Sequence, residues 1–572
     1  MSGSSTSPWA RTKHAFSSWS AFHDAIRLKS ASSMLANEDL LPSPPERQTW
    51  TVWNFFAYWW SESWAVSTWS LGSSLIALGA SVRDALLVIM FANVLSSVVI
   101  VLNGRAAARY HVGYPVLARV TFGIFGSYFF VVLRAILGII WGGVQLYFEG
   151  QFISICLRCI FPSWTKVPNK IPASQVITTQ VMVAFFLAFI FTLPLMLIHT
   201  SKIRHLFTLK AVIFPLAALG VVCWATTANG GVSSNTLVDE SLRSSRAVFA
   251  WGIVSQFNSV MGANSALLVT VPDLARYSKT KNGQLYGQLL GLPVAQTICA
   301  AFGVITTSAV HNMYGQLYWN PYDLLNAVLD HSYTSKARAG IFFAAASFAF
   351  ATMGTSVACN IVPFAADVTC LAPKYVNIIR GQFICLIVAF AIVPWRIVSS
   401  ANGFLSFLGG YSIFQGSVVS IMTVDYFFVR NGNLYLSDMF TTSPLGRYFY
   451  TCGVNFRGIA AFVIGFVLPL PGFIGSFGTT TVSAAATHMF DLGWLLSYFV
   501  GGFSYAVICL VTARKCMGEN KGDVFEGNVP SVIATGLGHD RLVVDGMEIV
   551  VGVPAREQEH DEHQSASVAK GV

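Results

Sequence analysis

The chain has 572 residues, of which 54% are hydrophobic and only 11% are charged, and its mean hydropathy is +0.59. Soluble globular proteins carry roughly 25% charged residues, so this composition excludes a soluble domain. The formal net charge of +9 does not imply a nucleic-acid partner, because lysine and arginine are spread among the predicted loops. We therefore expect an all-α polytopic membrane protein.

Apolar runs that are long enough to cross a bilayer recur along most of the chain. A hydrocarbon core of about 30 Å needs about 20 apolar residues per helix, and about twelve such runs are present. Spans are predicted at residues 53–79, 85–103, 123–160, 176–198, 206–227, 247–271, 288–311, 339–366, 381–399, 403–428, 457–476 and 490–512.

The sequence before the first span is polar and contains no apolar core of the length that a signal peptide requires. We therefore expect a mobile N-terminal tail in the cytosol, and an even number of spans places the C-terminal tail there too. Basic residues in the predicted inner connections favour this orientation. The 10 cysteines lie mostly inside spans, so we assign no disulfide, metal site or cofactor.

The first span contains the run Trp59-Trp-Ser-Glu-Ser-Trp64. It places Glu62 at membrane depth, where an acidic residue costs about 3 kcal/mol. Glu62 therefore needs a proton, a charged partner or a water-filled cavity. It can instead be purely structural, capping a broken helix or pairing with a neighbouring span.

The third span carries Trp141, Gln145 and Glu149 at steps of four, which puts them on one helix face. An indole offers a stacking surface, an amide offers donors and acceptors, and Gly142 and Gly143 allow close approach. Such a face can hold a flat, polar heterocycle. The alternative is that the face packs against other helices, with Gln145 satisfied across the interface.

The sixth span is also interrupted by polar residues, among them Gln256, Asn258, Gly262 and Asn264, which we expect to lie opposite Glu62. Two polar-interrupted helices five spans apart are typical of transporters that are built from inverted repeats and bind substrate at the midplane.

The eighth span holds Thr355, Ser356 and Asn360 on adjacent turns. Their oxygens can ligate a small cation or bond a substrate, although hydroxyls in membrane helices more often bond a carbonyl one turn earlier. Asp425, near the end of the tenth span, is interpreted as the structural partner of an arginine.

Several motifs occur together in one order and resemble the nucleobase–cation symporter-1 family, in particular its fungal uracil, uridine, allantoin, thiamine and nicotinamide riboside permeases. The resemblance covers about residues 37–515. It rests on Asn37-Glu-Asp-Leu-x-Pro-x-Pro-Pro-Glu-Arg-x-Thr-Trp50, Trp141-x-x-x-Gln145, Pro272-Asp-Leu-Ala-Arg-Tyr277, Gly354-Thr-x-x-x-x-Asn360 followed by Pro373-Lys-Tyr-Val-Asn-Ile-Ile-Arg-Gly381, and Asp425-Tyr-Phe-x-Val-Arg430.

The resemblance implies a LeuT-type fold with two five-helix inverted repeats and two extra helices. On that plan, residues 1–50 are the N-terminal tail, 51–428 the transport core, 429–512 the last two helices and 513–572 the C-terminal tail. It also implies that Trp141 stacks on the substrate ring while Gln145 and Asn360 bond its edge. Phe407 and Tyr411 are expected at an outer gate.

The family pattern is altered at several site positions. Asn264, beside Ala263, falls where a bacterial relative has a second stacking tryptophan, and Ala65 falls where fungal uracil permeases commonly have asparagine. The sodium site of that relative implies carbonyls at Ser61 and Trp64 and two hydroxyls on the eighth helix. Those two hydroxyl positions are Gly354 and Thr355 here, so one hydroxyl is missing. With Glu62 nearby, we favour proton coupling over sodium.

The leading hypothesis is a plasma-membrane proton symporter that imports a nucleobase-type heterocycle such as uracil, allantoin or uridine. Thiamine or nicotinamide riboside is an alternative, because a carboxylate among Trp60 and Trp64 suits a cationic ring. A transporter-like nutrient receptor is a second alternative. A membrane enzyme is not expected, since the spans lack a metal cluster or a nucleophile–base arrangement.

Overall fold

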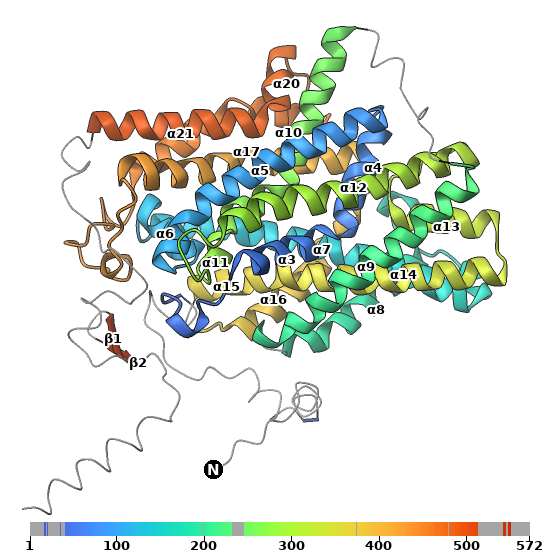
Figure 1. Ribbon diagram of the computed structural model, residues 1–572, viewed down its shortest axis with the longest axis horizontal. Coiled ribbons are helices and arrows are strands. Elements are labelled where there is room, and N and C mark those ends of the chain that lie inside the picture. Colours follow the sequence, from blue (N-terminus) through green and yellow to red (C-terminus); the bar gives the residue numbers. More distant parts are fainter. Residues whose placement is uncertain are drawn as a thin grey trace, which may run out of the picture.

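The computed structural model describes residues 40–197, 200–231, 245–372, 374–478 and 480–512, two short strands, and residues 17, 18, 20 and 35. The helices of the described part lie side by side in one elongated bundle (Figure 1). Most of the predicted tails, residues 1–50 and 513–572, lies outside the described residues. Within the second tail, β1 (Arg541–Val544) and β2 (Met547–Val550) pair antiparallel.

Each predicted span coincides with one helix or with consecutive helices. Eight helices in the described part are long and apolar enough to cross a membrane. In chain order the spans are α3 and α4 (Val52–Ser63, Val66–Ala77), α5 (Val82–Tyr110), α7 (Gly126–Ile160), α8 and η4 (Thr179–Thr192, Leu193–Leu197), α9 (Thr200–Ala228), α10 (Arg246–Thr270), α12 (Leu285–Tyr314), α14, η6 and α15 (Ser335–Thr355, Ser356–Ile361, Val362–Leu371), α16 (Ile378–Ala391), α17 and η8 (Ala401–Val424, Asp425–Val429), α18 and α19 (Phe456–Val467, Leu470–Gly475), and α21 (Gly493–Thr512).

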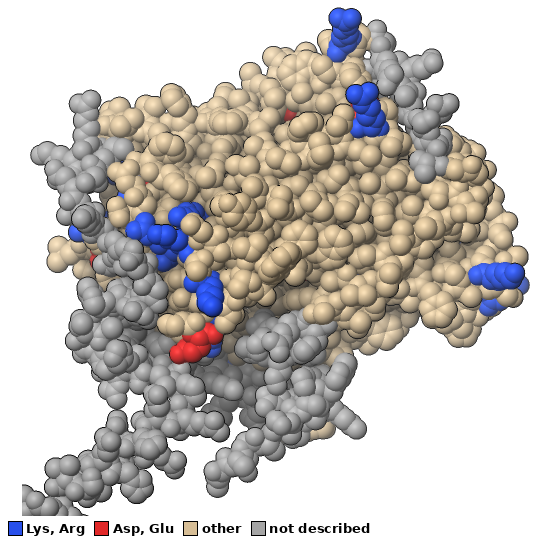
Figure 2. All heavy atoms as spheres, in the orientation of Figure 1, with Lys and Arg blue, Asp and Glu red and all other residues tan. Residues whose placement is uncertain are grey.

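Short helices connect the spans at the two ends of the bundle. They are η1 (Pro45–Arg47), α6 (Tyr114–Phe122), η2 (Pro162–Lys166), η3 (Ala173–Gln175), α11 (Pro272–Ala275), α13 (Pro321–His331), η7 (Pro394–Arg396), η9 (Ser437–Met439) and α20 (Ala484–Asp491). Charged side chains gather toward the margins of the face drawn in Figure 2, and a broad region between them is almost free of charge. A belt of this kind matches the hydrocarbon core of a bilayer.

The first span is broken in the middle, although no proline interrupts it. α3 ends at Ser63 and α4 begins at Val66, with Trp64 and Ala65 between them in non-helical conformations. The Ala65 carbonyl accepts the amide N–H of Trp69 at 3.1 Å, which starts α4, and also faces the Cys299 thiol. Non-helical backbone at membrane depth is tolerated where it is buried in protein or lines a cavity.

α12 packs closely on both halves of this broken helix. A Cβ atom on Gly287 would clash with the carbonyl oxygen of Val52 in α3, and one on Gly303 would lie 2.5 Å from the carbonyl oxygen of Trp69 in α4. Gly72 of α4 likewise faces the Ala300 carbonyl oxygen of α12, which would lie 2.6 Å from a Cβ atom on this glycine. Small residues thus let three backbones approach closely, as is common between membrane helices.

The eighth span contains a wider turn, η6, between α14 and α15. Such π-type turns inside α-helices are frequent at functional sites, because one extra residue reorients the side chains that follow. Here the turn carries Cys359 and Asn360. Thr355, just before it, donates its hydroxyl to the Ala351 carbonyl at 3.1 Å.

The segment just before the first span is ordered, which corrects the prediction that the whole N-terminal tail is mobile. Leu40 and Leu41 are buried, and the amide N–H of Ser43 donates to the His111 carbonyl at 2.8 Å. Arg276, in the connection after α10, donates from Nε to the Ser43 hydroxyl at 2.7 Å. Apolar burial and these bonds attach residues 40–48 to the bundle.

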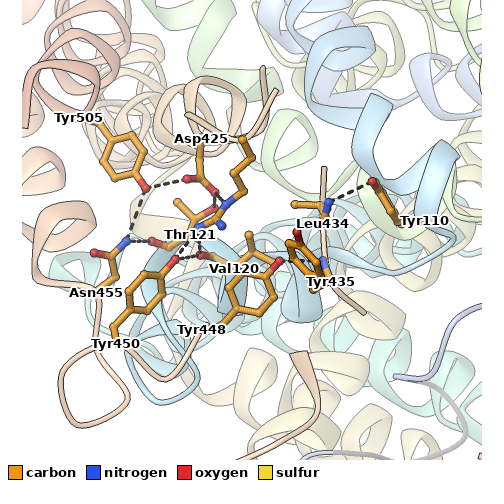
Figure 3. A network of polar contacts seen from close by, with 11 residues as sticks. Tyr110, Val120, Thr121, Asp425, Leu434, Tyr435, Tyr448, Tyr450, Asn455 and Tyr505 are labelled. Carbon is orange, nitrogen blue, oxygen red and sulfur yellow. Dashed lines mark hydrogen bonds and ion pairs between the residues drawn. The ribbon is translucent and has the colours of Figure 1, made fainter. Parts of the chain in front are cut away.

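At the same end of the bundle, a polar network joins α6, η8, α18 and α21 (Figure 3). Asp425 accepts bonds from Arg430 Nε and from the Tyr505 hydroxyl, both at 2.8 Å. Asn455 donates to the Thr121 carbonyl at 2.7 Å. The interpretation of Asp425 as the structural partner of an arginine is therefore confirmed.

Candidate functional site

The break in the first span opens onto a cavity in the middle of the bundle. Its wall is formed by the two half-helices α3 and α4, by α7, α10, α12 and α17, and by the eighth span. The lining residues are Trp59, Glu62, Ser63, Ser67, Thr68, Leu71, Trp141, Gln145, Ala263, Asn264, Ala266, Leu267, Leu292, Gln296, Thr355, Cys359, Asn360 and Phe404.

Aromatic rings form one side of this cavity. The Trp141 indole Nε1–H donates to the Tyr411 hydroxyl at 3.3 Å, and that hydroxyl donates to the Gly262 carbonyl at 2.6 Å. The ring of Phe407 lies 5.9 Å from the Trp141 ring, centroid to centroid. Tyr411 and Phe407, predicted at an outer gate, therefore stand behind Trp141 and fix its position without lining the cavity themselves.

Two amides that we expected at the site, those of Gln145 and Asn360, both line the cavity. Gln145 Nε2 donates to the Ser67 hydroxyl at 3.3 Å, which leaves Oε1 without a hydrogen-bond partner in the described part of the chain. Glu149, predicted on the same face, is not in the cavity wall. It accepts a bond from the Thr192 hydroxyl of α8 at 3.1 Å and so belongs to a helix interface.

From the sixth span, Ala263 and Asn264 line the cavity. The expectation that the other polar residues of this span lie opposite Glu62 is wrong for Asn258, which is not in the cavity wall and bonds the backbone of Phe490 and Trp494. Asn264 is tied into an amide chain. Its Nδ2 donates to Asn93 Oδ1 of α5 at 2.9 Å, and its Oδ1 accepts from Gln296 Nε2 of α12 at 3.0 Å.

Glu62 has two partners that the sequence analysis did not assign. Lys210 Nζ of α9 lies 3.5 Å from Glu62 Oε1, and the Cys359 thiol donates to Oε2 at 2.7 Å. The Lys210 side chain is completely buried. The sequence did contain an indication that Lys210 is functional or paired, because a lysine inside the apolar run 206–227 must find a counter-charge at membrane depth. Its partner was not predictable, because contacts between distant spans depend on the tertiary fold.

The positions predicted for cation coupling surround this ion pair but do not all face the cavity. The Ser61 hydroxyl donates to the Phe207 carbonyl of α9 at 3.2 Å, and Trp64 packs against Phe302. A Cβ atom on Gly354 would lie 3.3 Å from Lys210 Cδ. The absence of a side chain at Gly354 thus makes room for the lysine. Ala65, predicted at the substrate, lies in the helix break and is not part of the cavity wall.

Comparisons with known proteins agree with this geometry. The family described as permease for cytosine/purines, uracil, thiamine, allantoin matches residues 42–501. The chain belongs to this family. The match spans far more than half of the chain and includes every helix that contributes to the cavity, so the expectation of a transporter of the nucleobase–cation symporter-1 family is confirmed.

Individual relatives support the same assignment. The allantoin permease of Saccharomyces cerevisiae is 33% identical, over 83% of this chain and 76% of its own length. The uracil permease of the same yeast is 32% identical over the same shares. The solved structure of Mhp1, a nucleobase–cation-symport-1 transporter in a closed form with bromovinylhydantoin bound, has a TM-score of 0.65 at 19% identity and covers 85% of this chain and 97% of its own. The family fold is thus present here.

Proposed function

We propose that this permease is a plasma-membrane symporter that imports a neutral, nucleobase-type heterocycle together with a proton. The observation that carries the coupling is the Lys210–Glu62 pair beside the helix break, at 3.5 Å. The side-chain ammonium stands among the positions expected to hold a coupled cation. A fixed positive charge there opposes binding of a sodium ion, and the missing oxygen at Gly354 weakens a sodium site further.

The pair supplies a simple proton cycle. With Lys210 charged and Glu62 ionised, the net charge of the pair is zero. When Glu62 accepts a proton, the net charge becomes +1, which is the change that binding of a sodium ion would produce. Protonation also removes the attraction between the two side chains, so Lys210 and the neighbouring half-helix α3 are released from one another. A proton and a conformational step are thereby linked.

The same pairing argues against a cationic substrate such as thiamine or the nicotinamide riboside cation. Glu62 was the carboxylate available to balance such a charge, and Lys210 already neutralises it. The remaining polar groups of the lining side chains are amides, hydroxyls, indole N–H groups and a thiol, which suit an uncharged ring with N–H and C=O groups. The names of the relatives, which include allantoin and uracil permeases, fit this chemistry.

An uptake panel tests the proposal. The chain is produced in a host that lacks its own permeases, and accumulation of labelled uracil, allantoin, uridine, thiamine and nicotinamide riboside is measured. We expect accumulation of a neutral compound that stops with a protonophore and does not depend on external sodium. Accumulation that follows sodium would refute the coupling. Binding without accumulation would instead favour a receptor.

A further inference from the structure

Gln296 of α12 lines the cavity, and only one end of its side-chain amide is hydrogen-bonded in the described structure. Its Nε2 donates to Asn264 Oδ1 at 3.0 Å, whereas its Oε1 has no hydrogen-bond partner among the described residues. The residue is only 8% exposed. A buried amide oxygen without a donor costs roughly 1–3 kcal/mol, so a group of this kind in a cavity wall calls for a donor from a ligand.

The orientation of this amide is fixed by a chain of contacts. Asn264 donates to Asn93 Oδ1 at 2.9 Å and to the Ser96 hydroxyl at 3.1 Å, which directs the Asn264 oxygen toward Gln296. Asn93 and Ser96 are both on α5 and are fully buried. Three helices thus cooperate to present the Gln296 oxygen, and this preorganisation lowers the entropy lost when a ligand binds.

A second acceptor in the cavity has the same arrangement. Gln145 of α7 is only 2% exposed, its Nε2 donates to Ser67, and its Oε1 is unpaired in the described structure. Ser63, in the last turn of α3, also lines the cavity with a hydroxyl that has no partner there. The wall therefore offers two acceptors from different helices and a hydroxyl that can donate.

We propose that Gln296 is a specificity-determining residue, and that Gln145 and Gln296 each accept an N–H from the substrate, which is a cyclic imide or ureide with two ring N–H groups. This inference rests on the proposed function for its substrate class. The Ser63 hydroxyl is placed to donate to a ring carbonyl of the same compound. A ring with a single N–H leaves one of the two buried oxygens unpaired and is selected against.

The test uses the purified full-length chain in lipid nanodiscs, with uracil and its two N-methyl derivatives as probes and dissociation constants as the readout. Wild type should bind uracil and disfavour each derivative by about tenfold, which corresponds to one lost hydrogen bond. Gln296→Met, of similar length, should weaken uracil binding about tenfold. It should also bind one of the two derivatives as well as uracil, because the methyl group then meets no acceptor.

A specificity role predicts that Gln296→Met loses the tenfold discrimination against only one of the two N-methyl derivatives. General damage to the protein would instead weaken the binding of all three compounds alike. Gln296→Ala gives the same readout if the methionine variant is unstable. Gln382→Met is the matched control: Gln382 is fully buried with an unpaired amide in the described structure, but it is outside the cavity wall. It should leave all three constants unchanged.

Two results would overturn the inference. One is a Gln296→Met protein that keeps the wild-type ratios among the three probes, and the other is a wild-type protein that binds none of them. Failure of the proposed function has a different signature, because a chain that binds uracil with the predicted selectivity and yet does not accumulate it in cells is not a symporter. Binding and uptake thus report on the two proposals separately.

Discussion

Trp141 and Asn360 approach the cavity from different helices and contribute different chemistry. Trp141→Ala removes a flat stacking surface together with the bond to Tyr411, and Asn360→Ala removes an amide from the wide turn of the eighth span. Loss of a buried partner costs about 1–3 kcal/mol, or roughly 5–150-fold in affinity. We therefore expect uptake to be abolished in both variants at a normal level of protein in the membrane.

The matched control is Trp224→Ala, because Trp224 lies on an exposed face of α9 away from the cavity. It should transport like wild type when uptake is normalised to the amount of protein at the surface. Normal transport by both cavity variants would place the substrate elsewhere.

Glu62 and Lys210 are best tested together. Glu62→Gln should retain binding of a neutral heterocycle but lose accumulation that depends on external pH, because it removes the carboxylate that we propose as the proton acceptor. It also leaves the Lys210 charge buried without its counter-ion, a situation that typically costs about 3–5 kcal/mol. The double variant Glu62→Gln with Lys210→Met should recover that stability while remaining uncoupled. Unchanged affinity and pH dependence in Glu62→Gln would remove Glu62 from the mechanism.

The types and spacing of residues were enough to predict part of the site, but not the contacts between its residues. Trp141 and Gln145 were predictable, because a spacing of four residues places an indole and an amide on one face of an apolar span. Asn360 was predictable because it follows hydroxyl residues in the eighth span. Lys210 and Gln296 were not singled out, because their roles depend on Glu62 and Asn264, which are far away in the sequence. The same holds for Glu149, whose spacing matches Gln145 but whose partner, Thr192, is on another helix.

The close packing of α12 against α3 and α4, called the seam below, can be tested with a single glycine substitution. Gly303→Ala places a Cβ atom 2.5 Å from the Trp69 carbonyl oxygen, and backbone cannot move aside as a flexible side chain can. Overpacking of this kind costs about 1–3 kcal/mol. We expect a lower melting temperature of the purified protein, since the added methyl group pushes α12 away from α4.

Gly340→Ala is the control for this substitution. A Cβ atom at this position of α14 would have no heavy atom of another part of the described structure within 4 Å, so alanine meets open space there. Because alanine is the better helix former by about 1 kcal/mol, this variant should be as stable as wild type or slightly more stable. Equal melting temperatures for the two variants would show that the seam tolerates a methyl group.

The docked segment 40–48 should detach as the pH falls. His111 follows α5, its Nδ1 faces the Arg276 carbonyl at 2.9 Å, and burial together with the Arg276 charge lowers the pKa of its imidazole, burial being the larger cause. A group with a lowered pKa in the folded state adds stability above its ordinary value of about 6.5, and that stability is lost as the pH falls below it.

Hydrogen exchange at the Ser43 amide, compared at about pH 7.5 and about pH 5.5 after correction for the intrinsic rate, measures this effect on either side of the ordinary histidine pKa. Protection should fall at the lower pH in wild type. His111→Asn keeps a residue that tolerates the left-handed backbone at this position, where φ is 56°. It removes the titration, so protection in this variant should be independent of pH. A wild type with equal protection at both values would exclude His111 as the cause.

Over the whole molecule, composition and hydropathy were sufficient to locate the spans, because the bilayer imposes their length and polarity. They could not locate the break after Ser63, because no proline marks it and the contact of the Ala65 carbonyl with the Cys299 thiol of α12 exists only in the folded bundle. They also missed the ordered segment 40–48. Its leucines are few, and their burial depends on a surface that forms only when α5 and the connection after α10 meet.

The network around Asp425 should matter for the stability of the whole bundle and not for the substrate. Asp425→Ala would leave the guanidinium of Arg430 without its carboxylate and the Tyr505 hydroxyl without an acceptor. The effect on stability should be large because four segments of the chain meet at this network (Figure 3). Loss of one partner of a buried pair typically costs about 3–5 kcal/mol. The melting temperature should therefore fall clearly, while the protein that remains folded should bind uracil with the wild-type constant.

The exposed pair of Arg447 and Asp438 provides the matched control, because its Nε and Oδ2 atoms are 3.5 Å apart and 48% of the arginine side chain is accessible. Exposed pairs contribute about 0–1 kcal/mol, so Asp438→Ala should change neither the melting temperature nor binding. Cavity variants such as Asn360→Ala should show the reverse pattern of Asp425→Ala, with weakened binding and near-normal stability. A purely structural network affects binding only through the fraction of protein that is folded. Weaker uracil binding by Asp425→Ala at unchanged stability would therefore make the network part of the transport pathway.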